Sequence, residues 1–303
     1  MSENLIGDPV PAVKESEAQG EIAFIFDDIR TRLGTSSVNL IWRHLAIFPG
    51  ALPWCWGAIV PLFHGGELTE AARDYREGLR GPVLPQMPPD VRTALGLSFE
   101  DMMQISSTLR GYYVSCTMNI LSLNALLLVL KGARSDSESA KTVQTITGPG
   151  QPIAMEKMAR LLSPADMPPH VAELAWRLNG LGERGDGQIL ASLYRYLANW
   201  PAFLGATWTL IAPLAADGRL DAAIERGLAD ADLRARELVP RLSPPARALA
   251  KPTHDAVCTA LEDFGRNAIA KVIPITRTLL AVVGSGVDSL LPLRAESLHS
   301  PSS

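Results

Sequence analysis

Four polar side chains recur at helical spacing in one apolar stretch of the chain and are its strongest candidates for chemistry. They are Tyr112, Ser115, Cys116 and Asn119. Spacings of three and four residues place them on one face of a helix, and polar groups in so apolar a segment need hydrogen-bond partners. Partners on neighbouring helices would make this face structural, whereas a ligand as partner would make it the wall of a pocket. The thiol of Cys116 could be a nucleophile if it ionised, and is otherwise a small core group.

Lys271 is a second unusual residue, because it lies among the aliphatic side chains between Ala268 and Ile273. Such a lysine either extends toward solvent or meets an anion, so it is a candidate for binding a carboxylate. His64 precedes two glycines and is interpreted as a solvated loop residue or as a general base. The sequence has no histidine or cysteine cluster with metal-ligand spacing and no glycine-rich phosphate loop. We therefore expect no metal and no other cofactor.

The segments that must position these residues occur twice, 152 residues apart. WRHLAIFP at 42–49 corresponds to YRYLANWP at 194–201, and the match continues without a gap to Trp56 and Trp208. Shared tryptophan and proline at one register are unlikely by chance, so they indicate one helical unit fused in tandem. We predict an all-α fold of two pseudo-symmetric repeats around a shared core, a pseudo-dimer, with both tryptophans in equivalent sites.

Proline, glycine and charge patterns divide the chain into an N-terminal arm, two repeats, a linker and a tail. The predicted boundaries are 1–19 for the arm, 20–132 for the first repeat, 133–167 for the linker, 168–284 for the second repeat and 285–303 for the tail. Each repeat should end in a long apolar helix. The first begins at a Ser98–Asp101 capping box, and the second should run over 255–283 with a kink at Pro274.

Composition limits the classes of partner and compartment. Hydrophobic residues make up 47% of the chain and the net charge is −4, which gives no reason to expect nucleic acid or an anionic membrane as partner. The longest nearly uncharged stretches fall short of a membrane span of about 18 residues. Three cysteines far apart in sequence, with no segment typical of a signal peptide, favour a reducing cytoplasm.

Several short motifs occur in the same order as in a known family. They are Gly20-Glu21, Asp28-Ile29-Arg30, Arg43, Leu45-Ala46 and Phe48-Pro49-Gly50, followed in the second repeat by Leu197-Ala198-Asn199-Trp200-Pro201. In these motifs the chain resembles the group I, or D,L-, 2-haloacid dehalogenases. The resemblance implies a cofactor-free, all-helical homodimer acting on small carboxylic acids. In that family a carboxylate activates water, which displaces halide from either enantiomer without a covalent enzyme ester.

The residues that carry this chemistry in the family are replaced here. The position of the family's catalytic aspartate is Leu193, with Ser192 beside it, and a leucine cannot accept a proton from water. The family's water-holding asparagine falls on Cys116, and a Thr/Glu pair falls on Gly65 and Thr69. The chain therefore keeps the family's helical pattern but lacks the catalytic set.

Three functions remain open. The first is a diverged enzyme that displaces a leaving group from a small carboxylic acid without carboxylate-activated water. The second is hydrolytic dehalogenation with another base, such as Asp186 or His64. The third is a non-catalytic protein that binds a ligand or a partner.

For an enzyme, we assign the candidate residues by their expected roles. The catalytic candidates are Cys116, Asn119 and Ser192, and the substrate-binding candidates are Tyr112, Ser115, Leu193 and Lys271. Tyr112, Cys116 and Asn119 should face the second repeat, near Ser192 and Leu193, around a mainly apolar cavity.

Overall fold

The computed structural model describes residues 10–133, 158–185 and 189–284, and these residues form helices joined by short connectors, with no β-strand among them. The first-repeat helices are α1 (Gly20–Leu33), α2 (Leu40–Leu45), α3 (Ala51–His64), α4 (Glu67–Gly78), α5 (Pro89–Ala94) and α6 (Phe99–Leu130). The second-repeat helices are α7 (Pro169–Asn179), α8 (Ser192–Leu197), α9 (Pro201–Ala216), α10 (Arg219–Leu238), α11 (Lys251–Glu262) and α12 (Ala270–Val282). A π-helical stretch, Asp263–Ile269, joins α11 to α12. The predicted all-α class is confirmed.

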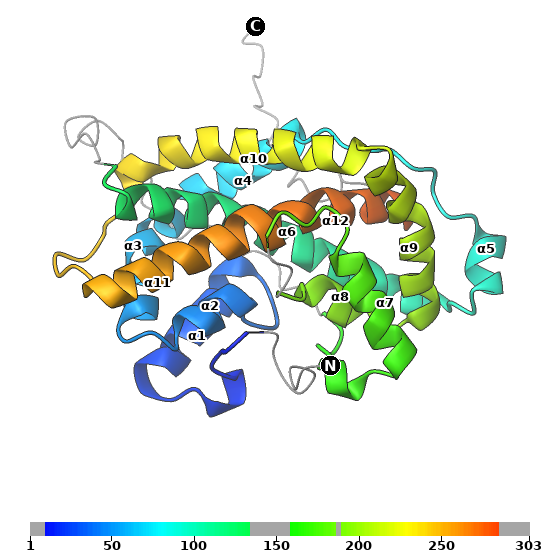
Figure 1. Cartoon of the computed structure of the whole chain (residues 1–303), viewed down its shortest axis with the longest axis horizontal. Coiled ribbons are helices and arrows are strands. Elements are labelled where there is room, and N and C mark those ends of the chain that lie inside the picture. The colour runs from blue at the N-terminus through cyan, green and yellow to red at the C-terminus, as the bar shows by residue number, and fades with distance from the viewer. Residues whose placement is uncertain (1–9, 134–157, 186–188, 285–303) are drawn as a thin grey trace, which may run out of the picture.

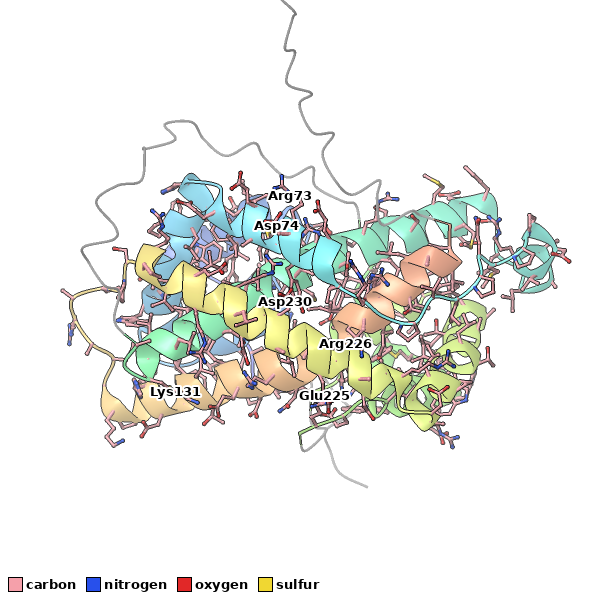
Figure 2. The ribbon with its side chains drawn as sticks, turned by 90° about the horizontal axis from the view of Figure 1, so that it is seen from above. Arg73, Asp74, Lys131, Glu225, Arg226 and Asp230 are labelled. Atoms are coloured by element: carbon pink, nitrogen blue, oxygen red, sulfur yellow. The ribbon has the colours of Figure 1, made fainter. Side chains whose placement is uncertain are left out.

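Helix α6 lies at the centre and packs against α4, α10, α11 and α12 (Figure 1). On one side of this core lie α1, α2 and α3, and on the other lie α7, α8 and α9. Figure 2 shows α4 and α10 covering one face, with Asp74 on α4 and Asp230 on α10. The two repeats therefore share one core through their longest helices.

The sequence of α6 explains both its start and its central place. Ser98 accepts a hydrogen bond from the Asp101 amide at 3.0 Å, and the Asp101 carboxylate accepts one from the Ser98 amide at 2.9 Å. This capping box satisfies amide groups that would otherwise lack partners at the first turn. The helix is long and apolar enough to cross a membrane, but 78% of its most apolar window is buried inside the protein, as in a core helix.

The helix bounds repeat at the spacing of the sequence repeat. The bounds of α8 are those of α2 plus 152. In the same way, α11 begins 152 residues after the start of α6, and α12 ends 152 residues after the end of α6. Gly66 and Gly218 precede α4 and α10 with φ of +79° and +80°, a conformation that favours glycine. Superposition of the two repeats in space stays a prediction.

Individual side chains depart from this correspondence. Trp56 is 3% exposed and donates a hydrogen bond to the Asp28 carboxylate at 2.8 Å. Trp208 is only half-buried, and the residue in register with Asp28 is Gly180, which offers no carboxylate. The prediction that both tryptophans occupy equivalent environments was therefore wrong.

The long helix of the second repeat is interrupted earlier than expected. It was predicted to run over 255–283 with a kink at Pro274, but the irregular turn is the π-helical stretch at 263–269. Pro274 lies inside α12, where its ring crowds the carbonyl of Ala270 and its nitrogen donates no hydrogen bond. This gives a local reason for an irregular turn just before Ala270.

The predicted connecting segments are described only in part. Of the arm, Glu15 pairs with Arg30 of α1 at 2.5 Å and accepts a hydrogen bond from the Val38 amide at 2.8 Å, so this segment is attached to the first repeat. Most of the predicted linker, and the whole predicted tail at 285–303, lie outside the described residues.

Candidate functional site

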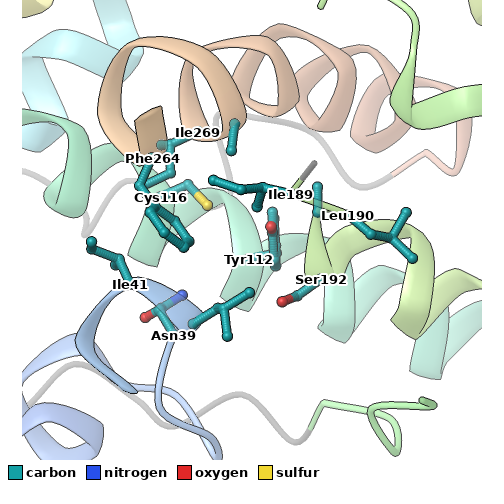
Figure 3. Close-up of a pocket in the computed structure, with 12 residues that line it drawn as sticks. Asn39, Ile41, Tyr112, Cys116, Ile189, Leu190, Ser192, Phe264 and Ile269 are labelled. Carbon is teal, nitrogen blue, oxygen red and sulfur yellow. The ribbon is translucent and has the colours of Figure 1, made fainter. Parts of the chain in front are cut away.

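A small internal hollow lies where both repeats meet, and we call it the central hollow (Figure 3). Its apolar walls are Leu40, Ile41, Ile189, Leu190, Ala191, Phe264, Ala268 and Ile269, and its polar side chains are Asn39, Tyr112, Cys116 and Ser192. They come from α2 and the residue before it, from α6, from residues 189–192 at the entry to α8, and from the π-helical stretch. The cavity measures about 30 Å³, and a single water needs roughly 10–15 Å³ by this measure. It therefore holds a few heavy atoms.

Tyr112 presents a hydrogen-bond donor to this hollow. Burial raises the pKa of its phenol well above the ordinary value, the neighbouring Cys116 adds to the rise, and the backbone amide of Leu193 opposes it. The phenol therefore stays protonated near neutral pH. Leu193 takes part through its backbone, since its side chain is buried and lines neither this hollow nor its neighbour.

Cys116 lines the hollow but is not an ionised nucleophile. Its side chain is 2% exposed, and burial raises the pKa of its thiol to about 12, although hydrogen bonds with Tyr112 and Ser115 act the other way. A thiol at this pKa is protonated at neutral pH and is a weak nucleophile. Of the two roles given from sequence, a nucleophile or a small core group, the high pKa favours the second.

Asn39 is a wall residue that the sequence did not reveal. It precedes α2 at the N-cap position, where asparagine normally bonds the helix amides, yet its side chain makes no capping hydrogen bond. Its Oδ1 atom is buried and has no hydrogen-bond partner among the described residues. A buried oxygen of this kind calls for an explanation such as a ligand or water. An asparagine before an apolar helix is typical of a helix cap. Sequence alone could therefore not distinguish a capping asparagine from one in the wall of a pocket.

A second, smaller hollow of about 10 Å³ adjoins the first, and we call it the side hollow. It shares Asn39, Leu40, Tyr112 and Ser192 with the central hollow and adds Thr35, Ser37, Val38, Arg43, Met158, Leu161 and Tyr196. The Arg43 side chain is mostly buried and brings a positive charge to this wall. The Ser37 and Tyr196 hydroxyls lie 2.5 Å apart. The side hollow therefore offers a cation and hydroxyl groups beside an apolar space.

Two of the polar candidates on α6 turn out to bond the protein itself. Ser115 donates a hydrogen bond to the Tyr112 carbonyl at 3.2 Å, and Asn119 accepts one from the Trp42 indole at 3.0 Å. Neither side chain lines a hollow. These hydrogen bonds favour a structural role for Ser115 and Asn119 over a place in the wall of the pocket.

Lys271 also meets a protein partner. It is fully buried, donates a hydrogen bond to the Asn179 carbonyl at 2.5 Å and forms an ion pair with Glu183. Its expected anion is thus a carboxylate of the protein, and Lys271 lines neither hollow. Its assignment to substrate binding is not supported by this placement.

The alternative bases are not found in the walls. His64 is exposed at the end of α3, and Asp186 lies outside the described residues. No aspartate, glutamate or histidine lines either hollow among the residues that the structure describes. Among the described residues, the walls of the two hollows supply hydroxyl, thiol, amide and guanidinium groups but no side chain that would accept a proton from water.

The motif at Asn199-Trp200-Pro201 has a structural role. The Trp200 indole donates to the Asp101 carboxylate at 2.9 Å, and the Asn199 amide donates to the Arg160 carbonyl at 2.8 Å. These bonds join α8 and α9 to the start of α6 and to the segment before α7. The motif therefore supports the site without touching it.

A larger apolar hollow of about 530 Å³ lies between α9 and the connector that carries α5. Its lining includes Met87, Val91, Ala206 and Leu210 but no ionisable side chain. It offers space without acid, base or nucleophile, so the smaller central hollow is the better candidate for chemistry.

Comparison with known proteins reveals one kind of likeness. No protein-family model matches the sequence, and no curated protein matches it. Among solved structures, a D-2-haloacid dehalogenase mutant in complex with D-2-CPA is similar to this chain, with a TM-score of 0.74 and 17% identity over 90% of this chain and 96% of that one. The same values hold for D-2-haloacid dehalogenase with L-LA. The helical fold is thus shared with these dehalogenase structures.

Proposed function

We propose that this protein is a dehalogenase-like enzyme that binds a small carboxylic acid and displaces a leaving group at carbon without carboxylate-activated water. The observation that carries the proposal is the make-up of the central and side hollows. Their described walls contain hydrogen-bond donors and one guanidinium but no general base. The likeness in fold to D-2-haloacid dehalogenases supports the reaction class.

The wall residues suggest how such a step would be assisted. Arg43 is suited to the substrate's carboxylate, while the Tyr112 hydroxyl and Cys116 thiol are donors for negative charge that develops on the leaving group. The apolar walls exclude water. An anionic group of the substrate itself would form the new bond to carbon, and the leaving group would depart with its electron pair. Such a nucleophile needs positioning but no base.

A second candidate is a ligand-binding protein without turnover. The high pKa values of Tyr112 and Cys116 favour it, because neither side chain is ionised at neutral pH. Both candidates require that a small acid enters the hollows, and they differ in whether it reacts.

Halide release separates these proposals from ordinary hydrolysis. We expect D-2-chloropropionate to lose chloride about 10²- to 10⁴-fold more slowly than with a D-2-haloacid dehalogenase assayed alongside, because a general base is absent. The L enantiomer is assayed in parallel and should also react slowly. Chloride is followed at several pH values. A rate equal to that of the reference enzyme would contradict the proposal, and Asp186 and His64 would then be substituted first.

Acid binding depends on Arg43 if the carboxylate lies in the side hollow. We expect Arg43→Gln to weaken binding of 2-chloropropionate by about tenfold or more, since a charge-assisted hydrogen bond is lost. The matched control is Arg195→Gln. Arg195 stands in register with Arg43, but it donates to the Leu162 carbonyl at 2.7 Å and lines neither hollow. Titration calorimetry measures the affinity of each purified variant for 2-chloropropionate. Equal losses of affinity in the two variants would refute the placement of the carboxylate beside Arg43.

A further inference from the structure

Two arginines and a tyrosine, away from both hollows, carry buried polar atoms that lack hydrogen-bond partners among the described residues. The atoms are Nε of Arg76 on α4, the hydroxyl of Tyr113 on α6 and Nε of Arg277 on α12. Arg76 also donates a hydrogen bond to the Thr117 hydroxyl at 2.8 Å. Thr117 lies one turn after Tyr113, so the Arg76 guanidinium lies over the face of α6 that carries the phenol.

Arg277 approaches the same phenol from α12. Burial raises the pKa of the Tyr113 phenol to about 12, while the positive charges of Arg277 and Arg76 act the other way. Arg277 also lies beside the connector that follows α4, because a Cβ atom added at Gly81 would be 3.8 Å from its Nη1 atom. Gly81 and Arg277 are both half-buried. The three residues, which we call the arginine cluster, therefore lie at the edge of the core, within reach of solvent beside Gly81.

The arginine cluster carries positive charge without a counter-ion. Arg76 is only 7% exposed, and burial lowers the pKa of its guanidinium. Among the described residues no carboxylate forms an ion pair with Arg76 or Arg277, and the neighbouring Glu77 lies 3.8 Å from Arg73 instead. A buried charge is costly unless an opposite charge and hydrogen bonds compensate it. The missing partner is thus an anion that accepts hydrogen bonds.

The equivalent surface of the other repeat shows that packing does not require these polar groups. The positions 152 residues away are buried and apolar: Leu228 for Arg76, Gly265 for Tyr113 and Ala125 for Arg277. The same helix surfaces therefore pack without charge in one repeat and with two guanidinium groups in the other. A desolvated charge that the fold can do without indicates a ligand.

We propose that Arg76, Tyr113 and Arg277 bind an oxyanion, a phosphate or carboxylate group, at a site separate from the central hollow. Each guanidinium donates charge-assisted hydrogen bonds to the anion, and the protonated Tyr113 hydroxyl donates one more. None of the three residues lines either hollow. This site is therefore independent of the proposed function.

Titration of the full-length protein with inorganic phosphate and with acetate tests this site. Nuclear magnetic resonance of isotope-labelled arginine follows the Nε–H signals of Arg76 and Arg277, which should shift with at least one probe and so distinguish a phosphate from a carboxylate. Arg277→Gln should weaken binding about tenfold or more, because a charge-assisted hydrogen bond is lost. Tyr113→Phe, which removes one neutral donor, should weaken it about three- to tenfold.

Arg73→Gln is the matched control, since it removes an equal charge from α4 at an arginine that already pairs with Asp74 at 3.2 Å. It should change the dissociation constant by no more than about twofold, because salt screens exposed charges. Melting curves establish that each variant folds, and Tyr113→Phe decides the result if Arg277→Gln does not fold. Equal losses in Arg73→Gln and Arg277→Gln would indicate general attraction to a basic surface and overturn the inference. Unchanged Arg76 and Arg277 signals with both probes would overturn it too, without affecting the proposed function.

Discussion

Glu183→Ala should lower the free energy of unfolding by about 3–5 kcal/mol. The substitution leaves the Lys271 ammonium fully buried, with only the Asn179 carbonyl as its described hydrogen-bond partner. A buried charge that loses its counter-ion is costly, whereas removing both charges is far less so. Urea unfolding measures the free energy of unfolding of Glu183→Ala and of the double variant Glu183→Ala/Lys271→Met. The double variant should recover much of the stability that Glu183→Ala loses.

A surface pair provides the control for this result. Glu173 and Arg177 form an ion pair on α7 with side chains 63% and 64% exposed, so Glu173→Ala should cost at most about 1 kcal/mol. Similar losses for Glu183→Ala and Glu173→Ala would show that the buried pair has no special role.

The effect of Glu183 should also depend on pH. Burial raises the pKa of this carboxyl, but hydrogen bonds from Lys271, Gly185 and Arg184 outweigh burial and bring it below its ordinary 4.5. A carboxyl with a lowered folded pKa adds stability above its unfolded pKa and loses it as pH falls through the folded one. The difference between wild type and Glu183→Ala should therefore shrink below about pH 4.5. A difference that stays constant down to pH 3 would contradict the ion-pair explanation.

Leu193→Asp should destabilise the protein by at least about 3 kcal/mol at neutral pH and should not create a dehalogenase. The Leu193 side chain is fully buried and lines neither hollow, so a carboxylate there would be desolvated and its pKa raised. The paired change Leu193→Asp with Cys116→Asn is the variant expected to release more chloride, because asparagine can orient water. Chloride release and urea unfolding are measured together.

The neutral substitution Leu193→Asn is the matched control for charge. A raised folded pKa makes the relative stability of Leu193→Asp greatest at low pH, and that stability is lost as pH rises through the folded pKa. The gap between the Asp and Asn variants should therefore widen from pH 4 to pH 8. Full family-like activity in Leu193→Asp alone would mean that this side chain reaches the substrate after all.

The sequence predicted the site residues correctly where helical periodicity alone decides which way a side chain faces. Tyr112 and Cys116 face the hollow as the spacing indicated, and Ser192 joins them from the second repeat. Asn119 shares the same helix face but lies farther along it, where the Trp42 indole is its partner. Spacing places side chains on a face, but it does not reveal what stands opposite each one.

The sequence by itself determined the helical class, the start of α6 and the register of 152 residues, because these depend on local apolar periodicity, capping and glycine positions. Only the tertiary structure decided which polar groups meet a cavity and which meet the protein. Lys271 pairs with Glu183, 88 residues away, and Asn39 caps no helix although its Oδ1 atom is buried without a partner among the described residues. Such pairings depend on how distant helices pack, and no local pattern encodes that distance.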